Sequence, residues 1–406
     1  MLKPTLPKNR ILSDKERKNL AILEVIRKEG PISRTDISKV TEFNIVTVSN
    51  YVNHYIKKGL VIEGELDEST GGRKPVLVEL NAKAAYIVGV GLNMMNVIGI
   101  LVDLSTNVIY EVKRERVPQN TEKVVDLLQE IVAEIFEKSG VDPAKIVGIG
   151  IAVPGVIDEK GRTVRWPGLI GTKDVSVCIS IKDIFEQRFK VPCFVENDAN
   201  AAVLGEKWLG LDREVRHMIY MFSGIGCGIM IDGEIYRGAS GASGELGIYS
   251  ALPEHQDLIR QQEEQLGRWE MELGMLGKAR ELVAKGTTGK LSDLVKGKAE
   301  DVRMRHIVEA VKTHDPHAIK LVEQGGYALG RKIAFLVNLM NPEVIVIGGG
   351  IEECGATLLD AVKDAVKTWA LEEAVNNVKI IPSAFGDKSV AFGVVGIVER
   401  EVFAQA

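Results

Sequence analysis

The feature that most constrains this chain is the order of segments in its first 80 residues, where three short helical patterns precede two strand-like ones. Ser13 and Ser33 each stand just before an apolar periodic run, and Gly30 and Gly59 follow such runs, as N-caps and helix stops do. The helices are expected at about 14–29, 34–40 and 45–58, and the strands at 60–62 and 76–80. This order predicts a winged helix-turn-helix, which we place at residues 1–82.

The third of these helices has apolar residues on one side and short polar residues on the other. The apolar spacing is shared by Val48, Val52, Tyr55 and Ile56. The polar face is expected to hold Asn44, Thr47, Asn50, His54 and Lys57, with Ser49 at its margin. Such a face suits a recognition helix in the major groove, where amides reach base edges and lysines reach phosphates. The alternative is a solvated face on a small protein-binding domain.

The segment between the two strands supports the DNA-binding interpretation. It contains Gly71-Gly72-Arg73-Lys74-Pro75, in which the glycines allow close approach and Arg73, followed by Lys74, can enter the negative minor groove. Residues 1–80 hold 14 Lys and Arg against 11 Asp and Glu, a net charge of +3, whereas the remainder has a net charge of −8. We therefore expect only the N-terminal part to contact a polyanion such as double-stranded DNA.

From about residue 84 the pattern changes to alternating strands and helices, which predicts a mixed α/β architecture. Strand-hairpin-helix units near residues 86 and 217 indicate two lobes with a cleft between them. We place the first lobe at residues 83–200, completed by the C-terminal helix, and the second at residues 201–406. Strands are expected at 86–92, 97–102, 146–152, 193–195, 217–223, 227–231 and 344–347, and helices near 121–138, 180–189, 198–208, 255–284, 302–312, 316–340 and 355–374.

The cysteines and the N-terminus bear on the compartment. Cys178, Cys193, Cys227 and Cys354 are scattered without a C-x-x-C pair, which is typical of a reducing environment. The N-terminal segment lacks the apolar core of a secretory signal. The uncharged stretch 86–102 contains Asn93 and Asn96 and is interpreted as buried strands, not as a membrane span. We expect a cytoplasmic protein with no membrane partner.

Five body motifs in the same order resemble those of the ROK family of repressors and sugar kinases. They are Gly148–Gly155, Glu196–Ala202, Ser223–Gly228, Gly244–Gly247 and Asn341–Gly350. T-V-S in the third helix and G-G-R-K-P in the wing resemble the repressor branch. The resemblance, which runs from about residue 14 to the C-terminus, implies a two-lobe actin/hexokinase-like (ribonuclease H-like) body.

Asn197 and Asp198 place an amide and a carboxylate side by side, and such a pair can hold vicinal sugar hydroxyls. In the kinases that the chain resembles, the aspartate matching Asp198 is the general base and the glutamate matching Glu245 contacts the sugar. With Gly155 from the first motif, these residues form the expected effector site for a sugar or sugar phosphate. The alternative for Asp198 is that it only caps its helix.

The first phosphate loop of the kinases has no counterpart here. Family kinases resemble one another in an Asp-x-Gly-Gly-Thr pattern, and the matching positions are Gly91, Asn93, Met94 and Met95. The carboxylate, the glycines and the hydroxyl are all replaced, although the second loop, Ser223–Gly228, is better kept. Because phosphoryl transfer depends on positioning and charge neutralisation, we expect no kinase activity and no cofactor.

The zinc site of the family is also absent from the sequence. Ile248 stands at the usual histidine position, and residues 249–285 contain no cysteine, so His255 alone cannot complete a site that needs about four ligands. We therefore expect no metal. The segment Glu254–Glu281 is interpreted as a charged amphipathic helix that either faces the core or joins a subunit interface.

These observations together predict a DNA-binding regulator of sugar metabolism genes, expected to be a repressor controlled by a sugar in a degenerate kinase cleft. One winged helix reads few base pairs, so a homodimer, or a tetramer made of two such dimers, is expected on the operator. Two alternatives remain open: an ATP-dependent sugar kinase with a regulatory N-terminal domain, and a DNA-binding dimer with a vestigial cleft.

Overall fold

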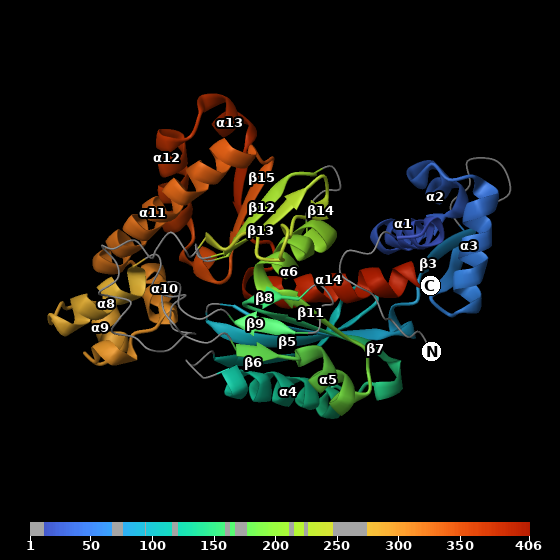
Figure 1. The fold of residues 1–406 in the computed structure, drawn as a ribbon, viewed down its shortest axis with the longest axis horizontal. Helices are drawn as coiled ribbons and strands as arrows, with labels where there is room; N and C mark the ends of the chain where they lie inside the picture. The colour runs from blue at the N-terminus through green and yellow to red at the C-terminus, as the bar shows by residue number, and fades with distance from the viewer. Residues whose placement is uncertain are drawn as a thin grey trace.

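The computed structural model describes residues 12–66, 76–93, 95–115, 121–158, 163–166, 177–210, 215–222, 226–246 and 274–406. Its strands form four sheets, two of three strands and two of five. A small N-terminal unit lies at one end, and the two five-stranded sheets with their helices make up the rest (Figure 1). None of the described helices is long and apolar enough to cross a membrane.

The N-terminal unit contains three helices and a three-stranded antiparallel sheet of order β1-β3-β2. Ser13 caps the first helix in a capping box with Glu16, Ser33 caps the second, and Asn44 caps the third. The caps at Ser13 and Ser33 are local signals, which explains why the starts of the first two helices were predicted correctly. The elements are α1 (Asp14–Glu29), β1 (Ile32–Ser33), α2 (Arg34–Thr41), α3 (Ile45–Lys57), β2 (Val61–Leu66) and β3 (Val76–Leu80).

The first large sheet has the order β11-β7-β4-β5-β6, in which β4 pairs with β7 in parallel and with β5 in antiparallel register. Helices α4 and α5 cover one face of it (Figure 1). The strands are β4 (Tyr86–Leu92), β5 (Asn96–Asp103), β6 (Val108–Glu115), β7 (Ile146–Val153) and β11 (Cys193–Asn197), and the helices are α4 (Thr121–Lys138) and α5 (Ile181–Phe189). A small sheet of β8 (Val156–Ile157), β9 (Val164–Trp166) and β10 (Val177–Ile179) follows β7.

The second large sheet has the order β14-β13-β12-β15-β16, and a group of helices covers one face with its own apolar core. Its strands are β12 (Met218–Phe222), β13 (Gly226–Ile231), β14 (Glu234–Ile235), β15 (Val344–Gly348) and β16 (Lys379–Pro382). Its helices are α8 (Met275–Ala284), α9 (Lys290–Leu294), α10 (Met304–Lys312), α11 (Pro316–Met340), α12 (Ala356–Trp369) and α13 (Glu372–Asn377).

Two helices lie between the large sheets, and their close contact joins the halves of the body (Figure 1). They are α6 (Asp198–Gly205), which continues into a π-helical turn at Glu206–Gly210, and α14 (Ser389–Ala404). A Cβ on Gly205 would lie 2.7 Å from Cα of Gly393, so only glycine permits this approach of the two backbones. The C-terminal end of α14 reaches the N-terminal unit.

The structure also corrects some sequence predictions. The helix predicted over 355–374 is two helices, because the chain turns extended at Ala370 and α13 starts anew after Leu371. Strand β6 is mostly solvent-exposed and carries little apolar periodicity, so it was missed. The predicted helix at Glu254–Glu281 is described only from residue 274 onward, where α8 begins at Met275.

Candidate DNA-binding helix and ligand site

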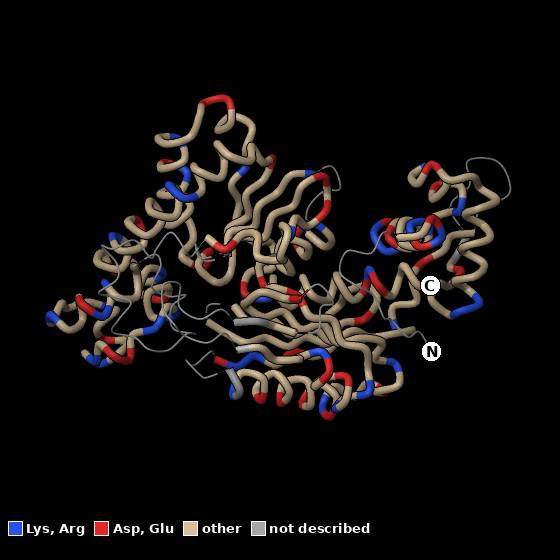
Figure 2. The backbone as a smooth tube through the Cα atoms, in the orientation of Figure 1, with Lys and Arg blue, Asp and Glu red and all other residues tan. Residues whose placement is uncertain are grey.

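Helix α3 presents a largely polar face to solvent. Asn50, His54 and Lys57 are exposed, and Thr47 and Ser49 are partly exposed, while Val48, Val52 and Tyr55 are buried against the rest of the N-terminal unit. Figure 2 shows basic positions gathered at the C-terminal end of this helix. The structure therefore brings Thr47, Asn50, His54 and Lys57 to one side of α3, with Ser49 at the margin of this face.

Asn44 has a different role from the others. Its side-chain oxygen accepts the backbone N–H of Val46 at 2.7 Å, so the residue caps α3. Only the amide N–H₂ of Asn44 is left to reach outward.

Three exposed residues on α3 escaped the sequence prediction, of which Ile45, 42% exposed, is the first residue of the helix. Val46 exposes 63% of its surface one turn before Asn50, and Asn53 is exposed beside His54. Val46 lies four residues before Asn50 and Asn53 lies three residues after it, and this spacing could have placed both on the face of Asn50. Val46 was omitted because its side chain is apolar. Arg73 and Lys74 of the expected wing lie outside the described residues.

Asn197 connects α6 to the first lobe. Its side-chain oxygen accepts the backbone N–H groups of Ala199 at 3.0 Å and Asn200 at 3.1 Å, and its amide nitrogen donates to the carbonyl of Gly155 at 3.2 Å. Asn197, not Asp198, is thus the N-cap of α6, which corrects the capping alternative for Asp198. Gly155 and Asn197 are in direct contact through the last of these hydrogen bonds.

Glu245 approaches the same region through strand β13. The carbonyl of Gly244 accepts the N–H of Cys227 at 2.8 Å, and the next strand residue, Gly228, lies so close to Ala199 that a Cβ would collide with its carbonyl. One strand therefore holds the Glu245 turn and the start of α6 side by side. The Glu245 side chain is exposed, yet the surrounding protein desolvates its carboxylate and raises its pKa.

A partly buried ion pair adjoins the start of α6. Arg237, after β14, donates to Glu196 Oε2 at 2.8 Å, and the other oxygen of Glu196 accepts the N–H of Asn197 at 2.9 Å. Asp198 is 3% exposed, and its Oδ1 accepts the N–H of Ala199 at 2.8 Å. Asn197 and Asp198 thus stand at the first turn of α6, and β13 brings the turn that carries Glu245 next to it. Their amide and carboxylate groups are of the kinds that hold hydroxyl-rich ligands.

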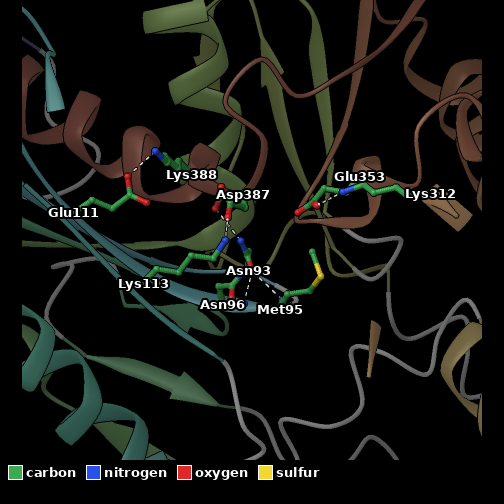
Figure 3. A network of polar contacts seen from close by, with 9 residues as sticks. All are labelled: Asn93, Met95, Asn96, Glu111, Lys113, Lys312, Glu353, Asp387 and Lys388. Carbon is green, nitrogen blue, oxygen red and sulfur yellow. Dashed lines mark hydrogen bonds and ion pairs between the residues drawn. The ribbon is translucent and has the colours of Figure 1, made fainter. Parts of the chain in front are cut away.

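The turn at the position of the kinase phosphate loop is held by a network of polar contacts (Figure 3). Asn93 Oδ1 accepts the N–H groups of Met95 at 2.8 Å and Asn96 at 2.6 Å, and Asn93 Nδ2 donates to the carbonyl of Asp387 at 2.8 Å. Lys113 donates to Asp387 Oδ2 at 2.6 Å. The turn is therefore bonded to the chain entering α14.

Apolar packing adds to this connection. The side chain of Met95 packs against the core of the second lobe, as does Leu246, the neighbour of Glu245. Arg305 of α10 forms an ion pair with Glu115 of β6, which also joins the lobes. Met94, also at the phosphate-loop position, and Ser223–Ile225 of the second loop are not among the described residues.

Metal ligands do not gather in the described part of the chain, where no three His, Cys, Asp or Glu side chains are placed to hold an ion. Ile248 and His255, which bear on the family's zinc site, lie outside it. Of the cysteines, Cys178 is exposed and the other three are buried thiols.

The fold and site define a two-lobed α/β protein of the sugar-kinase type, joined to an N-terminal three-helix unit. The ROK family profile matches residues 87–401, and the chain belongs to the ROK family. It is 30% identical over 394 residues to the xylose repressor of Caldicellulosiruptor bescii, covering 96% of this chain and 97% of that protein. It is 26% identical to the N-acetylglucosamine repressor of Shigella flexneri, covering 95% and 93%.

Two solved structures show the same fold. A ROK family transcriptional regulator, a homolog of the Escherichia coli MLC protein, aligns with a TM-score of 0.72 at 22% identity, covering 96% of this chain and 97% of that one. A ROK family glucokinase from Streptomyces griseus, in complex with glucose and AMPPNP, aligns with a TM-score of 0.64 at 24% identity, covering 77% of this chain and 99% of the kinase.

Proposed function

We propose that this chain is a DNA-binding transcriptional repressor of sugar metabolism genes whose affinity for its operator responds to a sugar. The observation that carries the proposal is the exposed face of α3, with its amides, imidazole and lysine directed away from a buried apolar stripe. Relatives named as repressors, similar over nearly their whole length, support it.

In this proposal residues 1–82 form a winged helix-turn-helix. Asn50 pairs with a base edge, Val46 contacts a thymine methyl group, and Lys57 contacts phosphate. Residues 83–200, completed by α14, form the first lobe, and residues 201–406 form the second. The division follows the sheets and the packing of α14 on β4 and β7.

The proposed effector is a sugar held by Asn197, Asp198 and Glu245 beside Gly155. Xylose and N-acetylglucosamine are the first ligands to test, because similar proteins carry those names. Kinase activity is not proposed, since Asn93 and Met95 are engaged in contacts with Asp387 and with the second-lobe core. A phosphate cradle would require these contacts to be broken.

A second copy of the chain is the proposed partner, and it would dock on an exposed apolar surface of α11 and α12. Its large side chains are between 41% and 64% exposed, and they are Tyr327, Phe335, Leu339, Trp369 and Leu371. They are ordered by contacts such as the hydrogen bond from Trp369 Nε1 to the Tyr327 hydroxyl at 3.0 Å. This surface lies away from α3 (Figure 1), so pairing there leaves the DNA-binding face open.

The DNA-binding proposal is tested by selecting duplexes from a random library with the purified full-length chain and measuring their affinity by fluorescence anisotropy. We expect Asn50→Ala to weaken binding by roughly 5- to 100-fold, and Lys57→Ala to reduce the slope of affinity against salt by about one. Asn377→Ala, on the distant α13, is the matched control. Failure of the wild-type chain to enrich any duplex would overturn the proposal.

The effector is tested by thermal shift with D-xylose, N-acetylglucosamine, D-glucose and ATP, since ligands of the native state raise its melting temperature. We expect one sugar to stabilise the chain, Asp198→Asn and Glu245→Gln to remove that shift, and ATP to have no effect. Sugar-dependent conversion of ATP to ADP with formation of a sugar phosphate, lost in Asp198→Asn, would instead establish the kinase. No shift from any sugar would favour a DNA-binding dimer with a vestigial cleft.

A further inference from the structure

The N-terminal unit and the body share a single hydrophobic cluster. Ile22 and Tyr55 of the N-terminal unit belong to the same buried group as Ile87 of β4 and Val395 and Phe403 of α14. Polar contacts cross this junction as well, because Asn19 Nδ2 donates to the carbonyls of Ala404 at 3.1 Å and Ala406 at 3.3 Å. The orientation of α3 therefore follows the position of α14.

A second set of contacts joins the N-terminal unit to the π-helical turn that continues α6. Arg27 of α1 donates from Nη2 to the carbonyl of Trp208 at 3.0 Å, and its guanidinium lies 5.5 Å from the centre of the Trp208 ring. Trp208 Nε1 donates to Glu399 Oε2 at 2.6 Å, and Arg27 Nε faces the same oxygen at 3.6 Å. Three elements meet at one buried cluster.

The cluster is poorly explained as a device for stability. The Arg27 and Glu399 side chains are 8% and 1% exposed, yet Arg27 Nε and Glu399 Oε1 make no hydrogen bond within the described residues. Buried charge pairs carry a desolvation penalty that well-packed apolar residues avoid. What such a pair does provide is a directional contact whose geometry changes when one partner moves.

The Trp208 end of this cluster belongs to the same continuous helical segment as the ligand site. Asn197 and Asp198 start α6, and Trp208 lies in the turn that follows it, with its ring 3.3 Å from where a Cβ on Gly396 would be. Because α6 is a rigid element packed along α14, a displacement at its first turn reaches Trp208 with little loss.

We infer that Arg27, Trp208 and Glu399 form a relay that transmits sugar binding at the start of α6 to the orientation of α3. The relay rests on the proposed function, and it assigns to these three residues a positioning role in regulation, without contact to DNA or sugar. Sugar binding shifts the π-helical turn, Trp208 changes its contacts with Arg27 and Glu399, and α1 carries α3 with it.

The test measures, on the full-length chain, the ratio of DNA affinities with and without sugar. The probe is whichever of D-xylose, D-glucose and N-acetylglucosamine changes the affinity of the wild-type chain most. We expect Arg27→Met and Glu399→Gln to bring this ratio close to one, a loss of about tenfold or more, while each variant still binds the sugar alone and the duplex alone.

Arg188→Met is the matched control, because Arg188 stacks on Phe189 at 5.3 Å in α5, away from both the N-terminal unit and the proposed dimer surface (Figure 1). Trp208→Phe retains a buried ring and removes the N–H to Glu399, so it tests the relay even where Arg27→Met fails to fold. If the variants melt at a lower temperature but keep the wild-type ratio of DNA affinities with and without sugar, the relay is wrong. The proposed function is not affected by that result. If the DNA affinity of the wild-type chain does not change with any of these sugars, the proposal of a sugar effector is wrong, and the relay is wrong with it.

Discussion

Gly91 lies so close to Val390 that a Cβ on the glycine would be 2.6 Å from Cγ1 of Val390 and 2.8 Å from the backbone nitrogen of Ala391. Strand β4 is therefore packed directly on the start of α14. The kinases that the chain resembles have a carboxylate at the position matching Gly91, whereas in this structure a side chain at that position would collide with α14. Glycine in place of the kinase carboxylate thus allows the C-terminal helix α14 to pack directly against β4.

Gly91→Ala is accordingly expected to destabilise the fold by about 1–3 kcal/mol, because the added methyl group must displace α14. Thermal or urea unfolding would measure the change. The control is Gly277→Ala in α8, where a Cβ would meet open space and helix propensity predicts a gain of up to about 1 kcal/mol. Equal effects at the two glycines would contradict the packing argument.

Tyr55→Phe is expected to loosen the junction between the N-terminal unit and the body. The buried Tyr55 hydroxyl donates to Asn19 Oδ1 at 2.9 Å, and the amide of Asn19 holds the end of the chain. Removing the hydroxyl leaves a buried acceptor without this donor, which costs about 1–3 kcal/mol. Urea unfolding measures the free energy of unfolding of Tyr55→Phe and of the control Tyr51→Phe, which lies on the same helix but outside this network. Similar losses of stability in both variants would contradict the role of the Tyr55 hydroxyl.

Glu352 is expected to make the stability of the fold depend on pH. Its Oε2 accepts the N–H of Gly350 at 2.8 Å, its Oε1 has no hydrogen-bond partner in the described chain, and burial raises its pKa to about 7 from 4.5. The folded state then binds the proton more tightly than the unfolded state. The stabilisation is complete below about pH 4.5 and is lost as the pH rises to about 7, at up to about 1.4 kcal/mol per pH unit.

Glu352→Gln removes this titration, so its stability relative to the wild-type chain should increase as the pH rises from 5 to 7. Denaturant unfolding at a series of pH values would show it. Glu353→Gln is the control, because the neighbouring side chain is 33% exposed and pairs with Lys312 at 3.0 Å. A difference between Glu352→Gln and the wild-type chain that stays constant with pH would refute the assignment.

Phe335→Glu is expected to convert the proposed homodimer to monomers, because it places a charge in the exposed apolar surface of α11 and α12. Light scattering coupled to size exclusion would report the mass. Ile109→Glu introduces the same charge at a residue of β6 that is 42% exposed and is expected to leave the mass unchanged. A wild-type monomer at micromolar concentration would dismiss this surface as the dimer contact.

Much of the N-terminal unit could be predicted from the sequence because its signals are local. The capping box of Ser13 and Glu16 and the cap at Ser33 lie within one turn of the helices they start. The buried stripe of α3 repeats at helical spacing, so Val48, Val52 and Tyr55 were assigned correctly to its inner side. Motif order likewise identified the family, since motifs are short and read without knowledge of contacts.

Only the tertiary structure decided which polar atoms of those motifs remain available to a ligand. It also decided which contacts join the N-terminal unit to the two lobes. The oxygen of Asn197 caps α6 and one of its amide N–H groups donates to Gly155, 42 residues away, which leaves its second N–H to reach a ligand. Arg27 and Trp208 are 181 residues apart and Trp208 and Glu399 are 191 apart, with no spacing pattern to connect them. Periodicity and caps record interactions within a few residues, whereas these contacts exist only after distant elements have packed.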